Sequence, residues 1–151
     1  MNQTSAKQMA IEIRTAEMLD VPELKKLNDF FNGEGCSTAE TIESSLKENG
    51  REIVCVAAKG NSLVGFCCGQ IFASVCYSYR YAEITELYVM DEYRRQGIGR
   101  RLVTFTEEEL CKHGVKHLHI LTGEANEKAQ ALYRSCGYKK TSEILLDKNL
   151  C

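Results

Sequence analysis

The sequence predicts an α/β protein with a mixed, mostly antiparallel sheet and helices on both faces. Apolar residues alternate with a period of two in several short segments and recur with helical spacing in others. A two-residue turn, Gly60-Asn61, joins two strand-like segments in the middle of the chain, which is typical of an antiparallel hairpin. Strand and helix patterns alternate only in the second half, which favours a mixed sheet.

The first half of the chain predicts one strand, two helices and a hairpin. Residues 11–16 alternate between apolar and polar side chains, as in a half-buried strand. Asp20, Pro22 and Glu23 then supply the cap, the early proline and the acid that are typical of a helix start. We therefore expect a strand at 11–16, helices from Asp20 to the break at 32–35 and from Ser37 to Asn49, and hairpin strands at 52–59 and 62–73.

The second half alternates between strands and helices. Gly114 marks the end of one helix and Asn126 marks the start of the next. We expect a strand at 81–90, a helix from Gly97 to His113, a strand at 116–123, a helix at 126–137 and a last strand at 138–148. The complete order is β-α-α-β-β-β-α-β-α-β. A ligand crevice is expected at the carboxyl end of the strand that precedes the arginine-rich turn.

The length and composition favour a single domain over residues 1–151 with an ordinary hydrophobic core. Of the 151 residues, 44% are hydrophobic and 26% are charged, and the formal net charge is -2. This charge argues against a nucleic-acid partner, so an anion site has to be local. The start of the sequence lacks the regions of a signal peptide, and the apolar stretches are too short for a membrane span. We therefore expect a cytoplasmic protein without a membrane partner.

Cysteine and histidine are frequent, but their spacing does not match a metal site. The eight cysteines include no CxxC pair, and without a secretion signal a disulfide framework is not expected. His113, His117 and His119 follow Cys111, yet they divide between a helix end and the next strand. We therefore expect no metal ion, weigh a thiol-redox or metal protein as the weakest hypothesis, and interpret most cysteines as packing residues.

The segment from Glu92 to Val103 places four arginines around two glycines, after an apolar strand and before a helix. A helix start leaves backbone N–H groups unpaired and carries a partial positive charge. Gly97 and Gly99 lack a Cβ, so a phosphate can approach the amides closely. The pattern R-x-x-G-x-G is neither a P-loop nor a Rossmann motif. It indicates either a polyanion site or a basic helix start on the surface.

A second motif, NEKAQALYRSCGY, lies at residues 126–138. Together with residues 86–103, it resembles the GNAT superfamily of acetyl-CoA-dependent N-acetyltransferases, and the order of elements agrees along almost the whole chain. The resemblance implies acetyl-CoA as co-substrate, with its pyrophosphate on the arginine-rich turn and its pantetheine arm paired with the preceding strand. The residues that it implies in coenzyme binding are Leu87, Tyr88, Val89, Arg94, Arg95, Gln96, Gly97, Ile98, Gly99, Arg100, Asn126, Ala129 and Tyr133.

Acetyl transfer from a thioester to an amine needs a base for the amine and a proton for the leaving thiolate. Tyr133 matches the general-acid tyrosine of the family, since a phenol with a pKa of ~10 stays protonated at neutral pH. The alternatives are that Tyr133 is a packing residue and that Asn126 is only a helix cap. Glu83 and Glu86 are the candidate bases. They can share a cleft only if a bulge interrupts the strand, as the family's bulge does, and the resemblance favours Glu86.

The sequence says less about the acceptor. The chain is similar to the small aminoglycoside N-acetyltransferases, and carboxylates around a cleft would attract a small cationic amine such as an aminoglycoside or a polyamine. The acidic residues concerned are Asp29, Glu34, Glu40, Glu43, Glu124, Glu143 and Asp147. A peptide or protein amine stays open as acceptor, as does a non-catalytic acetyl-CoA-binding sensor domain, although Tyr133 and Glu86 favour catalysis. An exposed strand edge would permit a homodimer.

Overall fold

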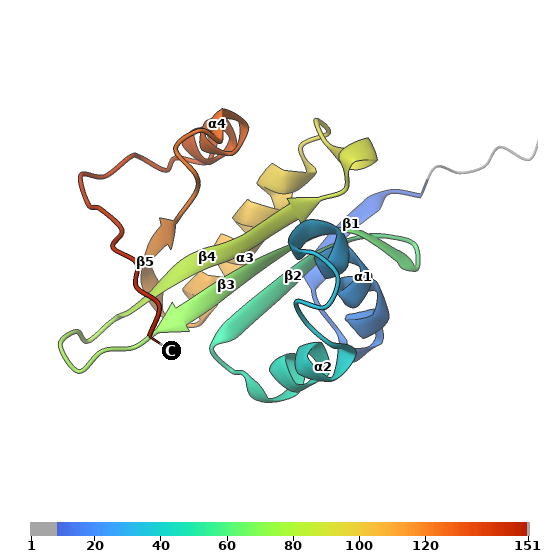
Figure 1. Cartoon of the computed structure of the whole chain (residues 1–151), viewed down its shortest axis with the longest axis horizontal. Helices are drawn as coiled ribbons and strands as arrows, with labels where there is room; N and C mark the ends of the chain where they lie inside the picture. Colours follow the sequence, from blue (N-terminus) through green and yellow to red (C-terminus); the bar gives the residue numbers. More distant parts are fainter. Residues whose placement is uncertain (1–8, 151) are drawn as a thin grey trace, which may run out of the picture. The chain divides into compact units, whose positions relative to one another are not determined.

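Five strands form one sheet in the order β1-β2-β3-β4-β5 (Figure 1). The computed structural model describes residues 9–150. Neighbouring strands are antiparallel except β4 and β5, which are parallel. The strands are β1 (Ile11–Thr15), β2 (Glu52–Lys59), β3 (Ser62–Phe72), β4 (Arg80–Val89) and β5 (Val115–Ile120), and the α-helices are α1 (Val21–Asn32), α2 (Ala39–Glu48), α3 (Ile98–Lys112) and α4 (Glu127–Ser135). The predicted mixed, mostly antiparallel sheet is confirmed.

The described residues group into two compact units that divide between Leu121 and Thr122. The first unit contains the sheet with α1, α2 and α3, and the second contains α4 and the chain that follows it. The candidate bases and the arginine-rich turn therefore belong to the first unit, whereas Asn126 and Tyr133 belong to the second.

One face of the sheet is covered by α1 and α2. Leu24 and Leu27 of α1 are buried in a cluster with Val56 of β2 and Phe66 of β3, and Ile42 of α2 packs against the same cluster. Burial of an aliphatic side chain of this size stabilises the fold by roughly 1.5–3 kcal/mol. The apolar stripes predicted for the first two helices therefore account for their docking.

The other face of the sheet lies against α3 at close range. A Cβ added at Gly69 would lie 3.1 Å from Leu110 Cδ1, and one at Gly65 would lie 3.3 Å from Leu102 Cδ1. Both leucines belong to α3 and are almost completely buried. The missing side chains on β3 thus let the helix approach the strand, and the prediction of helices on both faces is confirmed.

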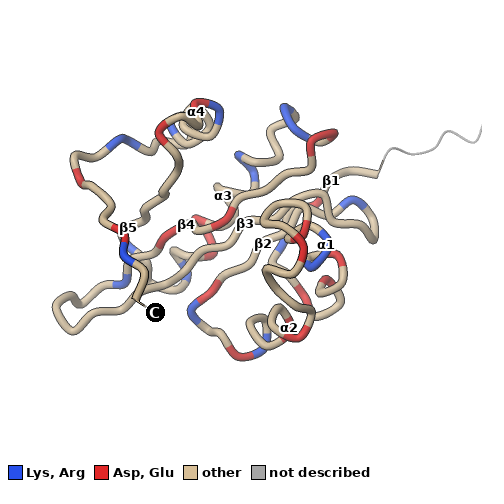
Figure 2. Tube along the Cα trace, in the orientation of Figure 1, with Lys and Arg blue, Asp and Glu red and all other residues tan. Residues whose placement is uncertain are grey.

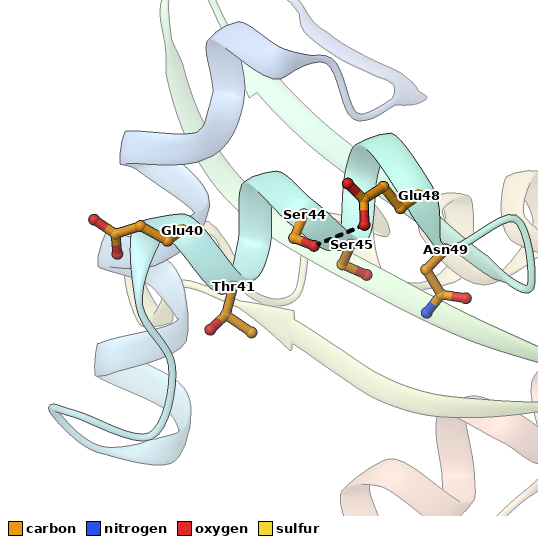
Figure 3. Close-up of a pocket in the computed structure, with 6 residues that line it drawn as sticks. All are labelled: Glu40, Thr41, Ser44, Ser45, Glu48 and Asn49. Atoms are coloured by element: carbon orange, nitrogen blue, oxygen red, sulfur yellow. Dashed lines mark hydrogen bonds between the residues drawn. The ribbon is translucent and has the colours of Figure 1, made fainter.

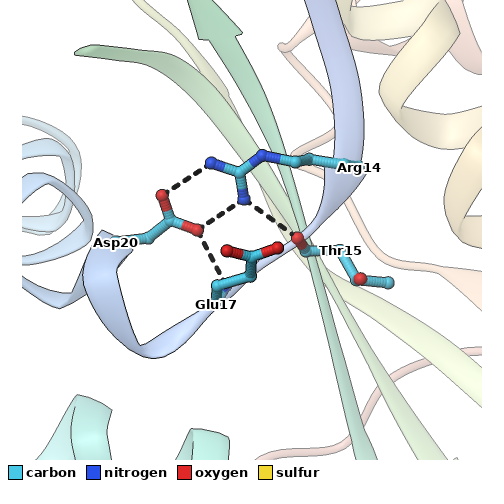
Figure 4. Close-up of polar contacts among 4 residues, drawn as sticks. All are labelled: Arg14, Thr15, Glu17 and Asp20. Atoms are coloured by element: carbon cyan, nitrogen blue, oxygen red, sulfur yellow. Dashed lines mark hydrogen bonds and ion pairs between the residues drawn. The ribbon is translucent and has the colours of Figure 1, made fainter. Parts of the chain in front are cut away.

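An ion pair holds the turn between β1 and α1 (Figure 4). Arg14 donates to both carboxylate oxygens of Asp20, at 2.6 and 2.9 Å, and the Glu17 N–H donates to Asp20 Oδ2 at 2.7 Å. Although burial raises the pKa of Asp20, the hydrogen bonds from Arg14 and Glu17 outweigh it and leave the pKa lowered. Asp20 occupies the predicted N-cap position of α1, but its side chain makes no cap hydrogen bond because these partners engage it.

The last predicted strand, at 138–148, is wrong. Residues 138–150 contain no strand, and Ile144, Leu145 and Leu146 are exposed. A strand is stable only where a neighbouring strand accepts and donates its backbone hydrogen bonds. The alternation of apolar and polar residues in this segment was therefore not enough to form a strand, because β5 is the last strand of the described sheet and this segment pairs with none of its strands.

The cysteines of β2 and β3 are packing residues, as predicted, but the same interpretation is wrong for Cys36, Cys76 and Cys111, which are exposed. Cys55, Cys67 and Cys68 are buried. Burial raises the pKa of Cys55 to about 11 and that of Cys67 to about 12, and it raises the pKa of Cys68 well above its usual value. These thiols stay protonated at neutral pH and are poor nucleophiles.

No group of three or more His, Cys, Asp or Glu side chains within residues 9–150 is arranged to hold a metal ion. Among the helices of the same residues, none combines the length and the apolar character needed to cross a bilayer.

Asp20→Ala should lower the free energy of unfolding by about 2–3 kcal/mol, because Arg14 and the Glu17 N–H would lose the buried carboxylate that accepts their hydrogen bonds. Asp29→Ala on α1, which removes the more exposed ion pair with Lys25, is the control and should cost about 0.5 kcal/mol. Urea unfolding measures both variants, and equal losses would contradict the prediction. Since the pKa of Asp20 is lowered by folding, its contribution should be lost as the pH falls through that folded-state pKa.

Candidate functional site

A β-bulge interrupts β4 at Thr85. Cys68 of β3 lies opposite Glu86, whereas the next residue of β3, Gly69, lies opposite Ile84, so Thr85 is an extra residue in its strand. The Thr85 side chain is exposed, and its hydroxyl lies 3.5 Å from the Cys68 carbonyl oxygen. An extra residue of this kind shifts the alternation of side chains on the bulged strand by one position.

The bulge places both candidate bases on one face of the sheet. Glu83 lies opposite Gln70 and Glu86 lies opposite Cys68. Residues 68 and 70 are two apart in β3, so they share a face, and their partners across the ladder share it too. It is the face on which α1 packs, because Cys68 belongs to the same buried cluster as Leu24. The bulge on which the sequence prediction depended is therefore present.

Glu86 is half-buried among polar side chains from α1 and β2. Burial raises its pKa, a hydrogen bond with Asn32 opposes that rise, and the negative charge of Glu52 adds to it. The raised pKa makes Glu86 a stronger proton acceptor once it is ionised. Sequence reasoning missed Asn32 and Glu52, since their approach to Glu86 depends on the docking of α1 and on strand register.

The last part of β4 has a free edge, because β5 pairs with β4 only as far as Ile84. The Met90 N–H donates to the Val64 carbonyl at 2.9 Å. Bonded and non-bonded residue pairs alternate along antiparallel strands. It follows that Leu87 and Val89 direct their backbone N–H and C=O groups away from β3, toward the edge that no strand of residues 9–150 covers.

Tyr88, the third residue predicted to offer its backbone, is oriented differently. By the same alternation its N–H and C=O groups point toward β3. Its ring contacts Phe31 of α1 and Phe66 of β3, with ring centroids 5.2 and 6.2 Å apart. Tyr88 therefore ties β4 to the α1 face of the sheet, and the outward backbone groups come from its two neighbours.

The arginine-rich turn has a backbone suited to an anion. Arg95 and Gly97 both have positive φ angles, 61° and 76°. Helix α3 begins at Ile98, and its first hydrogen bond runs from the Arg101 N–H to the Gly97 carbonyl at 3.0 Å. The N–H groups of residues 98–100 therefore have no acceptor inside the helix, at the end where the helix dipole is positive.

The four arginines of this turn divide into two pairs. Arg94 donates from Nε to the Val89 carbonyl at 2.8 Å, and Arg101 donates to a carbonyl of β1 at 2.8 Å. These two side chains are engaged by the protein, and Arg94 occupies one of the outward carbonyl groups of β4. Arg95 and Arg100 are exposed and are the arginines placed to add charge to the turn.

In the second unit, Asn126 is the N-cap of α4. Its side-chain oxygen accepts a hydrogen bond from the Ala129 N–H at 3.2 Å, which confirms the capping prediction. Tyr133 is half-buried, and its ring makes an edge contact with that of Tyr138, at a centroid distance of 6.1 Å. The two tyrosines are joined by a turn in which the Tyr138 N–H donates to the Tyr133 carbonyl at 3.0 Å.

Acidic residues, red along the trace in Figure 2, are spread over α1 and α2. Two of the acids proposed for an acceptor site are already paired on their own helices, Asp29 with Lys25 and Glu43 with Lys47. Glu34 and Glu40 are exposed.

A hollow of about 580 Å³ opens along α2 (Figure 3). Its lining combines hydroxyl, amide and carboxylate groups from Glu40, Thr41, Ser44, Ser45, Glu48 and Asn49. Ser45 also donates a hydrogen bond to Glu52, so one wall of the hollow is joined to the side chain whose charge acts on Glu86.

Residues 20–138 match the model of the acetyltransferase (GNAT) family. The chain belongs to this family. A curated relative, an uncharacterized N-acetyltransferase of Chlorobaculum tepidum, is 30% identical over 128 residues, which cover 85% of this chain and 75% of the relative. The GNAT assignment, predicted from the motifs at 94–99 and 126–138, is thus confirmed, and the chain is an N-acetyltransferase.

Solved structures share the fold of this GNAT acetyltransferase. An aminoglycoside acetyltransferase from an uncultured soil metagenomic sample, in complex with trehalose, matches with a TM-score of 0.81 at 22% identity and covers 93% of this chain and 96% of its own. AAC(6')-Iy, in complex with the bisubstrate analog CoA-S-monomethyl-acetylneamine, matches with a TM-score of 0.79 at 14% identity, with 94% and 99% covered.

Glu86→Gln should raise the melting temperature of this acetyltransferase at about pH 8. The raised pKa of Glu86 means that folding disfavours the ionised carboxylate, and glutamine keeps an oxygen for Asn32. The gain should vanish below the unfolded-state pKa of ~4.3, where the native glutamate is protonated in both states, and grow as the pH rises through the folded-state pKa. Glu108→Gln, on the exposed side of α3, is the charge-matched control. The same rise in both variants would contradict the prediction.

Proposed function

We propose that the chain transfers the acetyl group of acetyl-CoA directly to a primary amine of a small cationic acceptor, with Glu86 as base and Tyr133 as acid. The observation that carries this proposal is the bulge at Thr85. It sets the Glu83 and Glu86 carboxylates on one face of β4, directly before the residues that offer outward backbone groups.

The coenzyme supplies an acetyl thioester. The chain offers one set of groups suited to the pantetheine arm of the coenzyme and another suited to its pyrophosphate. The outward N–H groups of Leu87 and Val89 and the outward C=O group of Leu87 support strand-like pairing with the amides of the pantetheine arm, while Arg94 holds the Val89 carbonyl. The unpaired amides at 98–100, with Arg95 and Arg100 beside them, support a site for the pyrophosphate. We extend the coenzyme site, as the sequence predicts, to residues 94–100 as a whole and to Asn126, Ala129 and Tyr133.

Glu86 is favoured as the base over Glu83. A base has to accept a proton from the ammonium of the acceptor, and partial burial beside Glu52 raises the proton affinity of Glu86. Glu83 lies between Gln70 of β3 and His119 of β5 in the register of the sheet. We assign Glu83 a supporting role on the same face, where its charge would attract the cationic acceptor.

Tyr133 is proposed to donate a proton to the departing thiolate. A phenol with a pKa of ~10 stays protonated at neutral pH and can donate to a thiolate whose conjugate thiol has a pKa of ~8.5. When the amine nitrogen forms its bond to the acetyl carbon, the carbon–sulfur bond breaks and the sulfur takes up that proton. The edge contact with Tyr138 would hold the Tyr133 ring in place.

The proposed class of acceptor is supported by the acidic residues of the chain and by solved proteins of the same fold. Exposed Glu34 and Glu40 near α2, the polar hollow along that helix, and Glu83 together favour a cationic, hydrogen-bonding amine. Solved proteins of the same fold include aminoglycoside acetyltransferases, which supports an aminoglycoside or a polyamine. A peptide or protein amine is the second candidate, because the exposed tyrosines Tyr77 and Tyr79 between β3 and β4 could contact a chain. A non-catalytic acetyl-CoA sensor is the third.

The match to the family model spans both units, from residue 20 to residue 138. We therefore propose that residues 1–151 form one GNAT-type domain. The outer edge of β1, which pairs only with β2 among residues 9–150, leaves room for a homodimer.

Gly97→Ala should weaken acetyl-CoA binding about tenfold, about 1.4 kcal/mol, because a Cβ would point into the closest approach of the pyrophosphate. Gly114→Ala is a matched control: its φ is 79° against 76° at Gly97, and neither added Cβ would meet an atom within 4 Å. Both variants should therefore lose similar folding stability, of about 1–2 kcal/mol. Calorimetric titration with acetyl-CoA measures the binding. Equal loss of affinity in both variants would make Gly97 a structural glycine, and absence of binding by the native chain would overturn the coenzyme proposal.

Tyr133→Phe should lower kcat by about 10²-fold, because the thiolate loses its proton donor, while the affinity for acetyl-CoA stays within about twofold. Tyr138→Phe is the control, since its role is packing against Tyr133. Release of the coenzyme thiol is followed with a panel of aminoglycosides, polyamines and peptides. Unchanged turnover in Tyr133→Phe would remove the residue as acid, and turnover confined to peptides would replace the proposed acceptor class.

A further inference from the structure

Glu52, at the start of β2, lies outside every sequence motif and yet faces the candidate bases. It lies opposite Gln70 of β3, and Gln70 lies opposite Glu83 of β4. Paired residues share a face, so Glu52 is on the same face of the sheet as Glu83 and Glu86. Three carboxylates from two strands therefore share the face of the sheet that α1 and α2 cover.

The Glu52 carboxylate is held in place from α2. Ser45 donates a short hydrogen bond to Glu52 Oε2, which joins the helix to the strand. Glu52 on β2 and Glu86 on β4 lie on the two sides of β3, and the Ser45 hydrogen bond fixes the Glu52 side of this arrangement.

Other groups that face Glu86 are few. They are the uncharged Asn32 of α1, Glu52 of β2, the buried thiol Cys68 directly opposite on β3, Glu83 and Tyr88 on its own strand, and His119 of β5 beside Glu83. Among these groups no lysine or arginine offsets the negative charges. Within this set of groups, the charge of Glu52 therefore acts on Glu86 without an opposing lysine or arginine.

We propose that Glu52 is a positioning residue for the reaction: fixed by Ser45, it maintains a negative charge near Glu86 that keeps this carboxylate a strong proton acceptor. The inference rests on the proposed function, in which Glu86 is the base. Glu52 touches neither the acetyl group nor the amine in this scheme, and it acts only through Glu86.

The proton balance follows directly. The acceptor ammonium gives one proton to the Glu86 carboxylate, which becomes a neutral acid, and the amine is left with the lone pair that forms the new bond. Repulsion between Glu52 and Glu86 is relieved when Glu86 takes up this proton, so the step is favoured by the presence of Glu52. Without Glu52 the carboxylate would ionise more readily and would be a weaker base.

The test is Glu52→Gln, which keeps an oxygen for Ser45 and removes the charge. The pH titration of the Glu86 side chain is followed by carbon NMR in protein with labelled glutamate, and its signal is assigned with Glu86→Gln. The midpoint should move to lower pH in Glu52→Gln and stay unchanged in Glu43→Gln, which removes a paired charge on the outside of α2. Ser45→Ala, which releases the Glu52 side chain, should also move the Glu86 midpoint to lower pH, but by a smaller amount than Glu52→Gln does.

Activity gives the second measurement. In Glu52→Gln, the acidic limb of the plot of kcat/KM against pH should shift to lower pH, because Glu86 ionises more readily. The plateau of kcat/KM should fall, because Glu86 is then a weaker base. The profiles of the variant and the native protein should therefore approach each other at low pH. A purely structural role for Glu52 would lower the whole profile without moving its limb, and would overturn the inference. An unchanged Glu86 midpoint would overturn it as well.

The two measurements separate this inference from the proposed function. If no amine is acetylated but the Glu86 midpoint still moves in Glu52→Gln, the proposed reaction fails and the coupling between the carboxylates stands without a catalytic role. If amines are acetylated and the midpoint does not move, the reaction stands and the role of Glu52 is wrong.

Discussion

The single extra residue at Thr85 is the constraint on which the site depends. In a regular β4 strand, Glu83 and Glu86 would project from opposite faces, one toward α1 and the other toward α3. The bulge realigns the strand so that both carboxylates face α1, while Leu87 and Val89 present backbone groups at an edge that β5 has already left. One inserted residue thereby sets the side chains and the backbone groups of the proposed reaction next to each other.

The surroundings of Glu86 illustrate a trade between stability and reactivity. The face that docks α1 is apolar near Phe66 and Tyr88, but it becomes polar one residue pair further along, where Glu86 meets Asn32. Burial there disfavours the ionised carboxylate, which weakens the fold and raises the proton affinity of Glu86. The same packing that stabilises the sheet therefore gives this glutamate its chemical character.

Caps and turns within the sequence predicted most helices and strands correctly. The wrong predictions concern residues whose partners lie elsewhere in the chain. Asn126 caps α4, Gly60-Asn61 turns the hairpin between β2 and β3, and Gly114 ends α3, each through interactions within a few residues. The strand predicted at 138–148 has the alternation of a strand but no partner in the described sheet, so it is absent. Asp20 stands where a cap was predicted, and its carboxylate instead serves Arg14, a residue of the preceding strand.

By itself, the sequence determined the family and predicted an anion site at the arginine-rich turn, because helix starts, glycines and arginines act through neighbouring backbone. It also narrowed the base to two glutamates. Only the tertiary structure decided that both share a face, that Arg94 and Arg101 are engaged by carbonyl groups, and that Asn32 and Glu52 reach Glu86. These facts depend on strand register and helix docking, which arise from contacts between residues far apart in the chain.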